Sequence, residues 1–215
     1  MLFIIDIQNN YVNPEKGPMY IKNAEKLLPG IIEKIAEYKK KNDEIFYTTD
    51  IYTKVLPKIT EESIKGLENN NDLKNINVKE TLATDDEKWT FDLPNEINPY
   101  LEEYECLKKS HYALPPEIIL EIQQRFNKER KVIKEIEFVG VETHICVLAN
   151  AICIRSAFPD ANIVINKSLC MSSDMKNHEK GLEIMKSLGM EIRSWENAFK
   201  WWNVKRHNRE TNRLD

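Results

Sequence analysis

The stretch KVIKEIEFVGVETHICVLANAICIRSAF, residues 131–158, decides the fold class of this chain. Residues 131–141 form a short run rich in β-branched and aromatic side chains, which is typical of a buried strand. From 143 to 158 apolar residues recur at the spacing of a helix, so a helix is expected to begin close to the end of the strand. A strand that leads directly into a helix is the unit from which parallel β-α-β sheets are built.

The same alternation continues on both sides of this stretch. Further strands are predicted at 2–8, 44–50, 104–109, 162–168 and 190–195, and further helices at 24–41, 115–126, 174–189 and 195–202. Prolines and asparagines break up residues 51–104 into loops and short helices, of which 59–67 is a plausible one. A connection this long usually carries function or covers a site. Alternating strands and helices predict an α/β fold with parallel β-α-β units and right-handed crossovers.

Length and composition limit the class of protein. The chain has 215 residues, a size that fits one domain, and we expect that domain to span 1–202 with a polar tail at 203–215. A formal net charge of −4 gives no positive field for nucleic acid or an anionic membrane. No apolar run approaches the roughly 20 residues that cross a bilayer. Asp6 interrupts the apolar start and no basic region precedes it, so a cytoplasmic protein with free cysteines is expected.

Polar residues recur where predicted strands end. Parallel sheets bind ligands beyond the carboxyl ends of their strands, which directs attention to Asp6, Asp50, Lys109 and the turn before Cys146. If Thr143 caps the helix that follows, Cys146 lies in its first turn. The helix dipole and unpaired N–H groups there would stabilise a thiolate, with a pKa of about 3.5–7.5, and could hold an oxyanion. The alternative is a small inert core thiol, the commoner role of a free cysteine.

Asp6 and Lys109 each have an ordinary explanation as well. A carboxylate within an apolar strand must be solvated, paired or functional, because burial without a partner is costly. A lysine at a strand end commonly extends its ammonium to water. Alternation lets only one of Lys108 and Lys109 face the active side of the sheet. An acid, a cation and a thiol at three parallel strand ends together indicate a site that activates a nucleophile.

These motifs resemble the isochorismatase-like cysteine hydrolases, a superfamily related to nicotinamidases. LFIIDIQNNY (2–11) is similar to its opening strand with a catalytic aspartate, KKSHYA (108–113) resembles its lysine segment, and GVETHICVLANA (140–151) resembles its nucleophile segment. The resemblance implies a three-layer Rossmann-like fold, with a six-stranded, mostly parallel sheet, helices on both faces, and a homodimer or higher homo-oligomer.

The resemblance also implies a mechanism. Asp6 would take the thiol proton, Lys109 would hold both anions, and Cys146 would attack an amide-type carbonyl to give a covalent thioester. The peptide matching Val141 and Glu142 is commonly cis in the superfamily, and the backbone N–H groups of Glu142 and Cys146 would form the oxyanion hole. Isochorismate hydrolysis itself does not use a cysteine, so the chain is more similar to the amidohydrolase branch.

The chain departs from the nicotinamidase pattern at the metal ligands. Nicotinamidases carry an Asp-x-His pair after the second strand, whereas this chain has Tyr52 two residues after Asp50 and no histidine before His111. We therefore expect no metal and no other cofactor. Two alternatives stay open. One is a catalytically silent binding or assembly module of the same fold, and the other is a nicotinamidase with an atypical metal site.

Three further residues are candidates for substrate binding, namely Gln8, Trp89 and Tyr112. For Trp89 plain core packing is the main alternative. His144 lies only two residues before Cys146, and positions i and i+2 of a helix point about 200° apart. We therefore predict that His144 is a surface or rim residue and does not form a dyad with the thiol.

Overall fold

The computed structural model of the chain describes residues 1–50 and 85–194. The strands are β1 Leu2–Ile5, β2 Ile45–Asp50, β3 Glu105–Lys109, β4 Glu135–Val141, β5 Asn162–Met171 and β6 Glu191–Arg193. The α-helices are α1 Asn9–Val12, α2 Leu28–Lys40, α4 Asp85–Phe91, α5 Asn98–Leu101, α6 Pro116–Glu129, α7 Leu148–Ala157 and α8 Met175–Ser187. The helices expected at 59–67 and 195–202, and the tail at 203–215, lie outside the described residues.

The six strands form one sheet in the order β3-β2-β1-β4-β5-β6, and every neighbouring pair is parallel. The predicted α/β sheet is thereby confirmed, with all of its strand pairs parallel instead of most of them. The chain runs outward from β1 to β3, then returns to place β4 on the other side of β1. This reversal of strand order lies between β1 and β4, and in such sheets it opens a crevice at the carboxyl ends of the strands.

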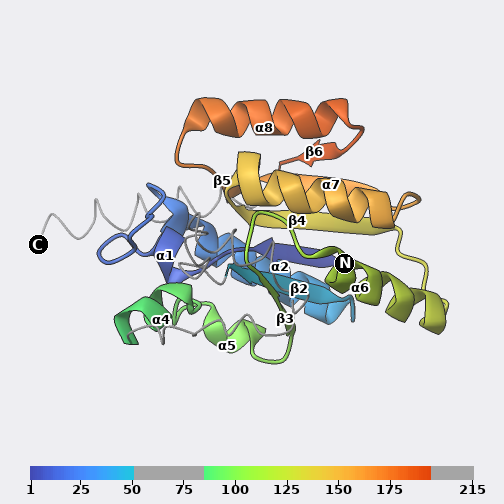
Figure 1. Ribbon diagram of the computed structural model, residues 1–215, viewed down its shortest axis with the longest axis horizontal. Coiled ribbons are helices and arrows are strands. Elements are labelled where there is room, and N and C mark those ends of the chain that lie inside the picture. Colours follow the sequence, from blue (N-terminus) through green and yellow to red (C-terminus); the bar gives the residue numbers. More distant parts are fainter. Residues whose placement is uncertain (51–84, 195–215) are drawn as a thin grey trace, which may run out of the picture.

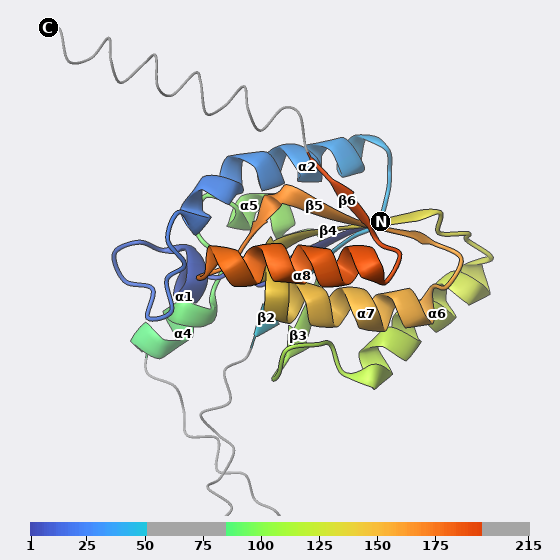
Figure 2. The same ribbon diagram turned by 90° about the horizontal axis from the view of Figure 1, so that it is seen from above.

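Helices cover both faces of the sheet (Figures 1 and 2). On one face α6, α7 and α8 pack against alternate strand residues, with Phe3 stacked on Phe138 and tilted against Phe46 at ring-centroid distances of 5.2 and 5.3 Å. On the other face α1, α2 and α5 pack against Leu2 and Ile4. Because both faces of β1 are covered, its four residues are all apolar and buried, as expected of a central parallel strand.

Gly140 allows β4 to pass close to the end of β1, where it pairs with Ile5. Its φ is +122°, and a Cβ atom at this position would lie 2.1 Å from the backbone oxygen of Ile5. Only glycine fits such a conformation and such a contact. The close approach brings the turn after β4 next to the residue that follows β1. In the part of the chain that is described, no helix has both the length and the apolar character to span a membrane.

Candidate active site

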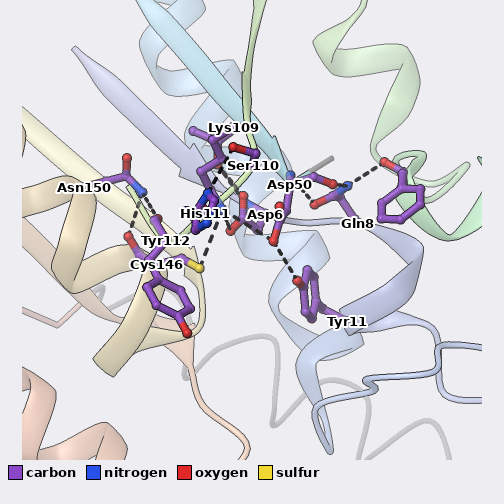
Figure 3. Close-up of polar contacts among 12 residues, drawn as sticks. Asp6, Gln8, Tyr11, Asp50, Lys109, Ser110, His111, Tyr112, Cys146 and Asn150 are labelled. Atoms are coloured by element: carbon purple, nitrogen blue, oxygen red, sulfur yellow. Dashed lines mark hydrogen bonds and ion pairs between the residues drawn. The ribbon is translucent and has the colours of Figure 1, made fainter. Parts of the chain in front are cut away.

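Four polar side chains from four strand ends meet at the carboxyl edge of the sheet (Figure 3). Asp6 follows β1, Asp50 ends β2, Lys109 ends β3, and Cys146 lies in the turn after β4. Asp50 and Lys109 are register partners in adjacent strands. Lys109 is buried whereas Lys108 is exposed. The sequence-based choice of Lys109 as the inward-facing lysine is therefore consistent with the geometry.

The ammonium of Lys109 lies between the carboxylate and the thiol. Its Nζ is 2.7 Å from Asp6 Oδ2, and it donates hydrogen bonds to Cys146 Sγ at 3.7 Å and to the backbone oxygen of His111 at 3.0 Å. Burial, the largest single influence, lowers the pKa of Lys109, but the anionic charge of Asp6 and the neighbouring Cys146 and Asp50 together raise it above its usual value. Lys109 is therefore a cation at neutral pH.

Asp6 is buried and has a fixed orientation. Thr48 donates its hydroxyl hydrogen to Asp6 Oδ1 at 2.6 Å and accepts the Asp6 backbone N–H at 3.1 Å. The other carboxylate oxygen, Oδ2, accepts no hydrogen bond of ordinary geometry and is balanced by the ion pair with Lys109. The backbone φ of Asp6 is 50°, a value that residues other than glycine rarely adopt but that aspartate tolerates better than most. The sharp turn after β1 aims the carboxylate at the lysine.

The prediction that Cys146 has a lowered pKa and is a thiolate is wrong. The pKa of the Cys146 thiol is raised, first by burial and then by the negative charge of Asp6, and Lys109 offsets only part of this effect. Its side chain shows only 9% exposure, so water does little to stabilise an anionic sulfur. A hydrogen bond between the thiol and Asp6 raises the pKa further. The sulfur therefore keeps its proton, beside a carboxylate that can accept it.

The turn that carries Cys146 differs from the expected α-helix. Thr143–Val147 form a turn of π-helix in which the N–H groups of Ile145 and Val147 both donate to the Glu142 backbone oxygen, and α7 begins only afterwards. The N-cap is Glu142 and not Thr143. Thr143 Oγ1 instead forms a hydrogen bond with Nδ1 of the buried His178 at 2.8 Å, because α8 packs directly on this turn.

The residues just before the turn are held from β5. The Val141–Glu142 peptide is cis, as the resemblance implies. The Glu142 carboxylate accepts hydrogen bonds from the backbone N–H and the hydroxyl of Ser173, at 2.9 and 2.8 Å. His144 is partly buried, and its Nδ1 lies 3.0 Å from Ser172 Oγ. The imidazole therefore faces β5, which agrees with the prediction that it forms no dyad with the thiol.

Asp50 is a second carboxylate at the edge of the site. Its Oδ2 accepts a hydrogen bond from the Tyr11 hydroxyl at 3.4 Å and lies 4.0 Å from Lys109 Nζ. Burial raises the pKa of Asp50, with the Lys109 charge acting in the opposite direction. Among residues 1–50 and 85–194, no three His, Cys, Asp or Glu side chains are grouped to hold a metal ion. Among the described residues, the Tyr11 hydroxyl and the Lys109 ammonium contact the Asp50 carboxylate, and neither is an imidazole or thiolate ligand of the kind that zinc favours.

The three candidate substrate-binding residues differ in their surroundings. For Gln8 a substrate contact stays a prediction. Its buried amide already bonds to backbone: Oε1 accepts the Asp50 N–H at 2.8 Å, and Nε2 donates to the backbone oxygens of Asp50 and Phe91. Trp89 is partly buried in α4, and its backbone oxygen accepts a hydrogen bond from Asn9. Tyr112 is 65% exposed, so the described residues do not enclose its ring. For Trp89 and Tyr112 a substrate contact stays a prediction.

Two residues of the site were not predicted from the sequence. Thr48 orients Asp6, and Asn150 bonds to the backbone of Cys146. Asn150 had a detectable signal, because it is a polar residue four positions after Cys146 in an otherwise apolar helix and so shares its face. Thr48 had none, since threonine is common in strands for reasons unrelated to hydrogen bonding.

Comparison with known proteins agrees with the motifs. The sequence profile of the Isochorismatase domain matches residues 1–197. A search of curated proteins finds no match. Among solved structures, an isochorismatase-like hydrolase from Alkaliphilus metalliredigens is 18% identical with a TM-score of 0.61, covering 94% of this chain and 97% of that one.

Two further solved structures have the same fold. The pyrazinamidase/nicotinamidase of Streptococcus mutans UA159 is 22% identical with a TM-score of 0.62, over 89% of this chain and 98% of that one. The pyrazinamidase of Pyrococcus horikoshii in complex with zinc is 19% identical with a TM-score of 0.60, over 90% of this chain and 98% of that one. At this identity the likeness concerns the fold, whereas the profile match covers most of the chain. The chain belongs to the isochorismatase-domain family.

Proposed function

We propose that this protein is a cysteine-dependent hydrolase that cleaves the C–N bond of a small amide-type substrate. The proposed catalytic residues are Asp6, Lys109 and Cys146. One observation carries the proposal: a buried ammonium contacts a buried carboxylate at 2.7 Å and a thiol sulfur at 3.7 Å, at the carboxyl edge of a parallel sheet. An acid, a base and a nucleophile within reach of one another are what acyl transfer requires.

In the first step the sulfur of Cys146 attacks the substrate carbonyl carbon while its proton passes to Asp6. A thiol with a raised pKa stores no thiolate in advance, so proton transfer has to accompany attack. Lys109 stabilises the negative charge that develops on sulfur and then remains paired with Asp6 or its neighbours. The C–S bond forms, and the carbonyl oxygen becomes an oxyanion.

We assign the oxyanion to the backbone N–H groups of Glu142, which caps the turn before α7, and of Cys146, which lies within that turn. Donors of this kind, fixed before the reaction begins, each contribute about 3–4 kcal/mol to lowering a barrier. At the start of the turn, Ser173 holds the Glu142 side chain and His178 holds the Thr143 side chain, which restrains the backbone that carries these N–H groups. When the intermediate collapses, Asp6 returns the proton to the leaving nitrogen and the C–N bond breaks.

The product of this half-reaction is a thioester on Cys146 and a free amine or ammonia. Asp6, again a carboxylate, then takes a proton from water as the water oxygen attacks the thioester carbonyl. The C–S bond breaks and the sulfur regains its proton. The net reaction converts an amide and water into a carboxylic acid and an amine.

The names of two related structures support a small ring carboxamide as one substrate class to test, since they are a nicotinamidase and a pyrazinamidase. One of these relatives binds zinc. In the described part of this chain, Asp50 contacts the Tyr11 hydroxyl and the Lys109 ammonium, which are not zinc ligands, and our mechanism has no step through a metal. We also propose that the protein is a homodimer or higher homo-oligomer, as the family resemblance implies, and that it works in the cytoplasm.

The strongest rival is a catalytically silent module of the same fold. The observation that favours it is the low exposure and raised pKa of the Cys146 thiol, which are also properties of an inert core cysteine. An inert thiol, however, needs neither a buried lysine nor a buried aspartate beside it, and these cost free energy to bury.

The test is a screen of small amides, ureas and carbamoyl compounds for release of ammonia or amine, run in parallel on the wild type and Cys146→Ala. We expect turnover of at least one class by the wild type and at least about 1000-fold less by the folded variant. Turnover that survives in Cys146→Ala would falsify the nucleophile assignment. Metal analysis of the same samples addresses the third reading: stoichiometric zinc or iron with nicotinamide turnover would establish an atypical nicotinamidase.

A further inference from the structure

The loop between β3 and α6 is a part of the site that lies outside the strands and helices. It follows Lys109 directly and passes beside the turn that carries Cys146 (Figure 3). One end is fixed from inside the site, where Lys109 Nζ donates to the backbone oxygen of His111 at 3.0 Å. The remainder, residues 112–114, is held by the burial of Leu114 in the core and by the hydrogen bonds of one side chain from another element.

That side chain is Asn150, in the first turn of α7 and fully buried. Its Nδ2 donates to the backbone oxygen of Cys146 at 2.8 Å and to that of Tyr112 at 3.0 Å. Its Oδ1 accepts the backbone N–H of Leu114 at 2.8 Å. Both amide hydrogens and the amide oxygen are thus engaged. One planar group joins the turn of the nucleophile to the loop that continues from the lysine strand.

We propose that Asn150 is a positioning residue that sets the distance between the Cys146 sulfur and the Lys109 ammonium. Lys109 ends β3, whereas Cys146 lies in the turn after β4. In the sheet, β2 and β1 lie between β3 and β4. The contact between Lys109 and Cys146 at 3.7 Å is therefore not fixed by strand pairing. The amide bridge adds a backbone connection to the ion pair of Lys109 with Asp6, because it holds the Cys146 backbone and the loop after Lys109 to one planar group.

This inference rests on the proposed function, since it matters for catalysis only if Cys146 is the nucleophile. Its direct consequence can nevertheless be measured without any substrate. Lys109 is the neighbour that lowers the pKa of the Cys146 thiol, against burial and the charges of Asp6 and Asp50. Tyr11 also faces this group, as an uncharged phenol whose pKa burial raises. Loosening the bridge should weaken the lysine contact and move the pH profile of thiol alkylation upward.

A purely structural role for Asn150 is the explanation to exclude, and the chain offers a matched control. Asn166 in β5 is also fully buried and also donates its amide, to Glu137 Oε1 at 2.7 Å. Glu137 belongs to a polar cluster with Lys34 and Tyr38 on the α2 face of the sheet, apart from the candidate site. Asn166→Ala should lower stability for the same kind of reason as Asn150→Ala, without moving the site.

The experiment compares wild type, Asn150→Ala and Asn166→Ala in the full chain. Melting temperature reports stability, and iodoacetamide labelling of Cys146, followed by peptide mass spectrometry from pH 6 to 11, reports the thiol. We expect both variants to melt earlier and only Asn150→Ala to shift the labelling profile to higher pH. With a substrate from the amide screen, its kcat should fall by about 100-fold while KM stays within a few-fold, as a small misplacement of reacting groups predicts.

A labelling profile and a kcat for Asn150→Ala that match those of Asn166→Ala would overturn the inference. If Asn150→Ala does not fold, Asn150→Ser takes its place, because a serine hydroxyl can reach the carbonyl four residues earlier in the helix but not the loop. It should keep more stability yet shift the labelling profile as well, and a wild-type profile in this variant would contradict the bridge. Turnover retained by Cys146→Ala would instead refute the proposed function, whatever the labelling shows.

Discussion

Thr48 holds Asp6 by two hydrogen bonds, donating to the carboxylate Oδ1 at 2.6 Å and accepting the backbone N–H at 3.1 Å. The two residues come from adjacent strand ends, β2 and β1. The pair leaves Asp6 one oxygen, Oδ2, to face Lys109. The direction in which the proposed general base points is thus set by a neutral hydroxyl and not by the cation alone.

Thr48→Val tests this relationship with little change in volume. The variant leaves a buried carboxylate oxygen and a buried N–H without partners, and each such group costs about 1–3 kcal/mol. We expect the free energy of unfolding in urea to fall by about 2 kcal/mol or more. Turnover should fall as well, because Asp6 is free to rotate away from the sulfur.

Thr48→Ser is the control, since it keeps the hydroxyl and removes only a methyl group. Most of the stability and turnover should return in this variant. If Thr48→Val unfolds at the wild-type urea concentration and turns over at the wild-type rate, the hydroxyl does not orient Asp6.

The fold was largely predictable because its strands are short apolar runs separated by amphipathic helices. Covered on both faces, β1 and β4 read as nearly continuous hydrophobic segments, which identifies a parallel sheet. The short helix α1 was not predicted, and α4 and α5 were expected only as unplaced short helices within 51–104, since four to seven residues give too few turns for a period to appear. Residues 51–84 lie outside the described part of the chain.

The site was predictable in its residues but not in its electrostatics. Strand ends and motif resemblance identified Asp6, Lys109 and Cys146, which the structure brings together. The sequence favoured a lowered pKa for the thiol because it indicated only a helix beginning near Cys146. Burial and the charge of Asp6 raise that pKa instead, and both depend on contacts between residues about 140 positions apart. The backbone partners of Gln8, which are Asp50 and Phe91, are likewise distant in sequence and could not be predicted from it.

Asp50→Asn should separate the roles of the two carboxylates. The Cys146 thiol has a hydrogen bond with Asp6 but only a charge interaction with Asp50, so Asp6 is the carboxylate placed as the base. We expect Asp6→Asn to lower kcat by about 100- to 10,000-fold, the usual range for a general base. Asp50→Asn should change kcat by less than about 10-fold. A comparable loss in both variants, measured with one substrate, would indicate that Asp50 holds an essential group such as a metal ion.

His178, which packs against the turn that carries Cys146, should make the free energy of unfolding depend on pH. Burial lowers the pKa of His178 below its usual 6.5, so the unfolded chain binds a proton more readily than the folded protein does. The contribution of His178 to the free energy of unfolding is therefore fully present above about pH 6.5, the pKa of its imidazole in the unfolded chain. It falls as the pH drops below that value, and it stops falling below the pKa of His178 in the folded protein. His178→Asn keeps a polar partner for Thr143 but does not titrate in this range.

Urea unfolding of the wild type and His178→Asn between pH 5 and 8 measures this contribution. The difference between the two proteins removes the common titration of the carboxylates. We expect the wild type to lose more stability than the variant as the pH falls. Parallel curves would mean that His178 titrates alike in the folded and unfolded chain.

The most direct test of the account is the pH dependence of Cys146 alkylation in the wild type, Lys109→Met and Asp6→Asn, followed on the peptide that contains Cys146. In the wild type, labelling should rise only above pH 9, the ordinary pKa of a thiol, because burial and the charge of Asp6 raise the pKa of Cys146 above that value. Removing the cation should move the profile to higher pH, and removing the anion should move it to lower pH. Three superimposable profiles, or shifts of the same sign, would contradict a carboxylate, an ammonium and a thiol that act on one another.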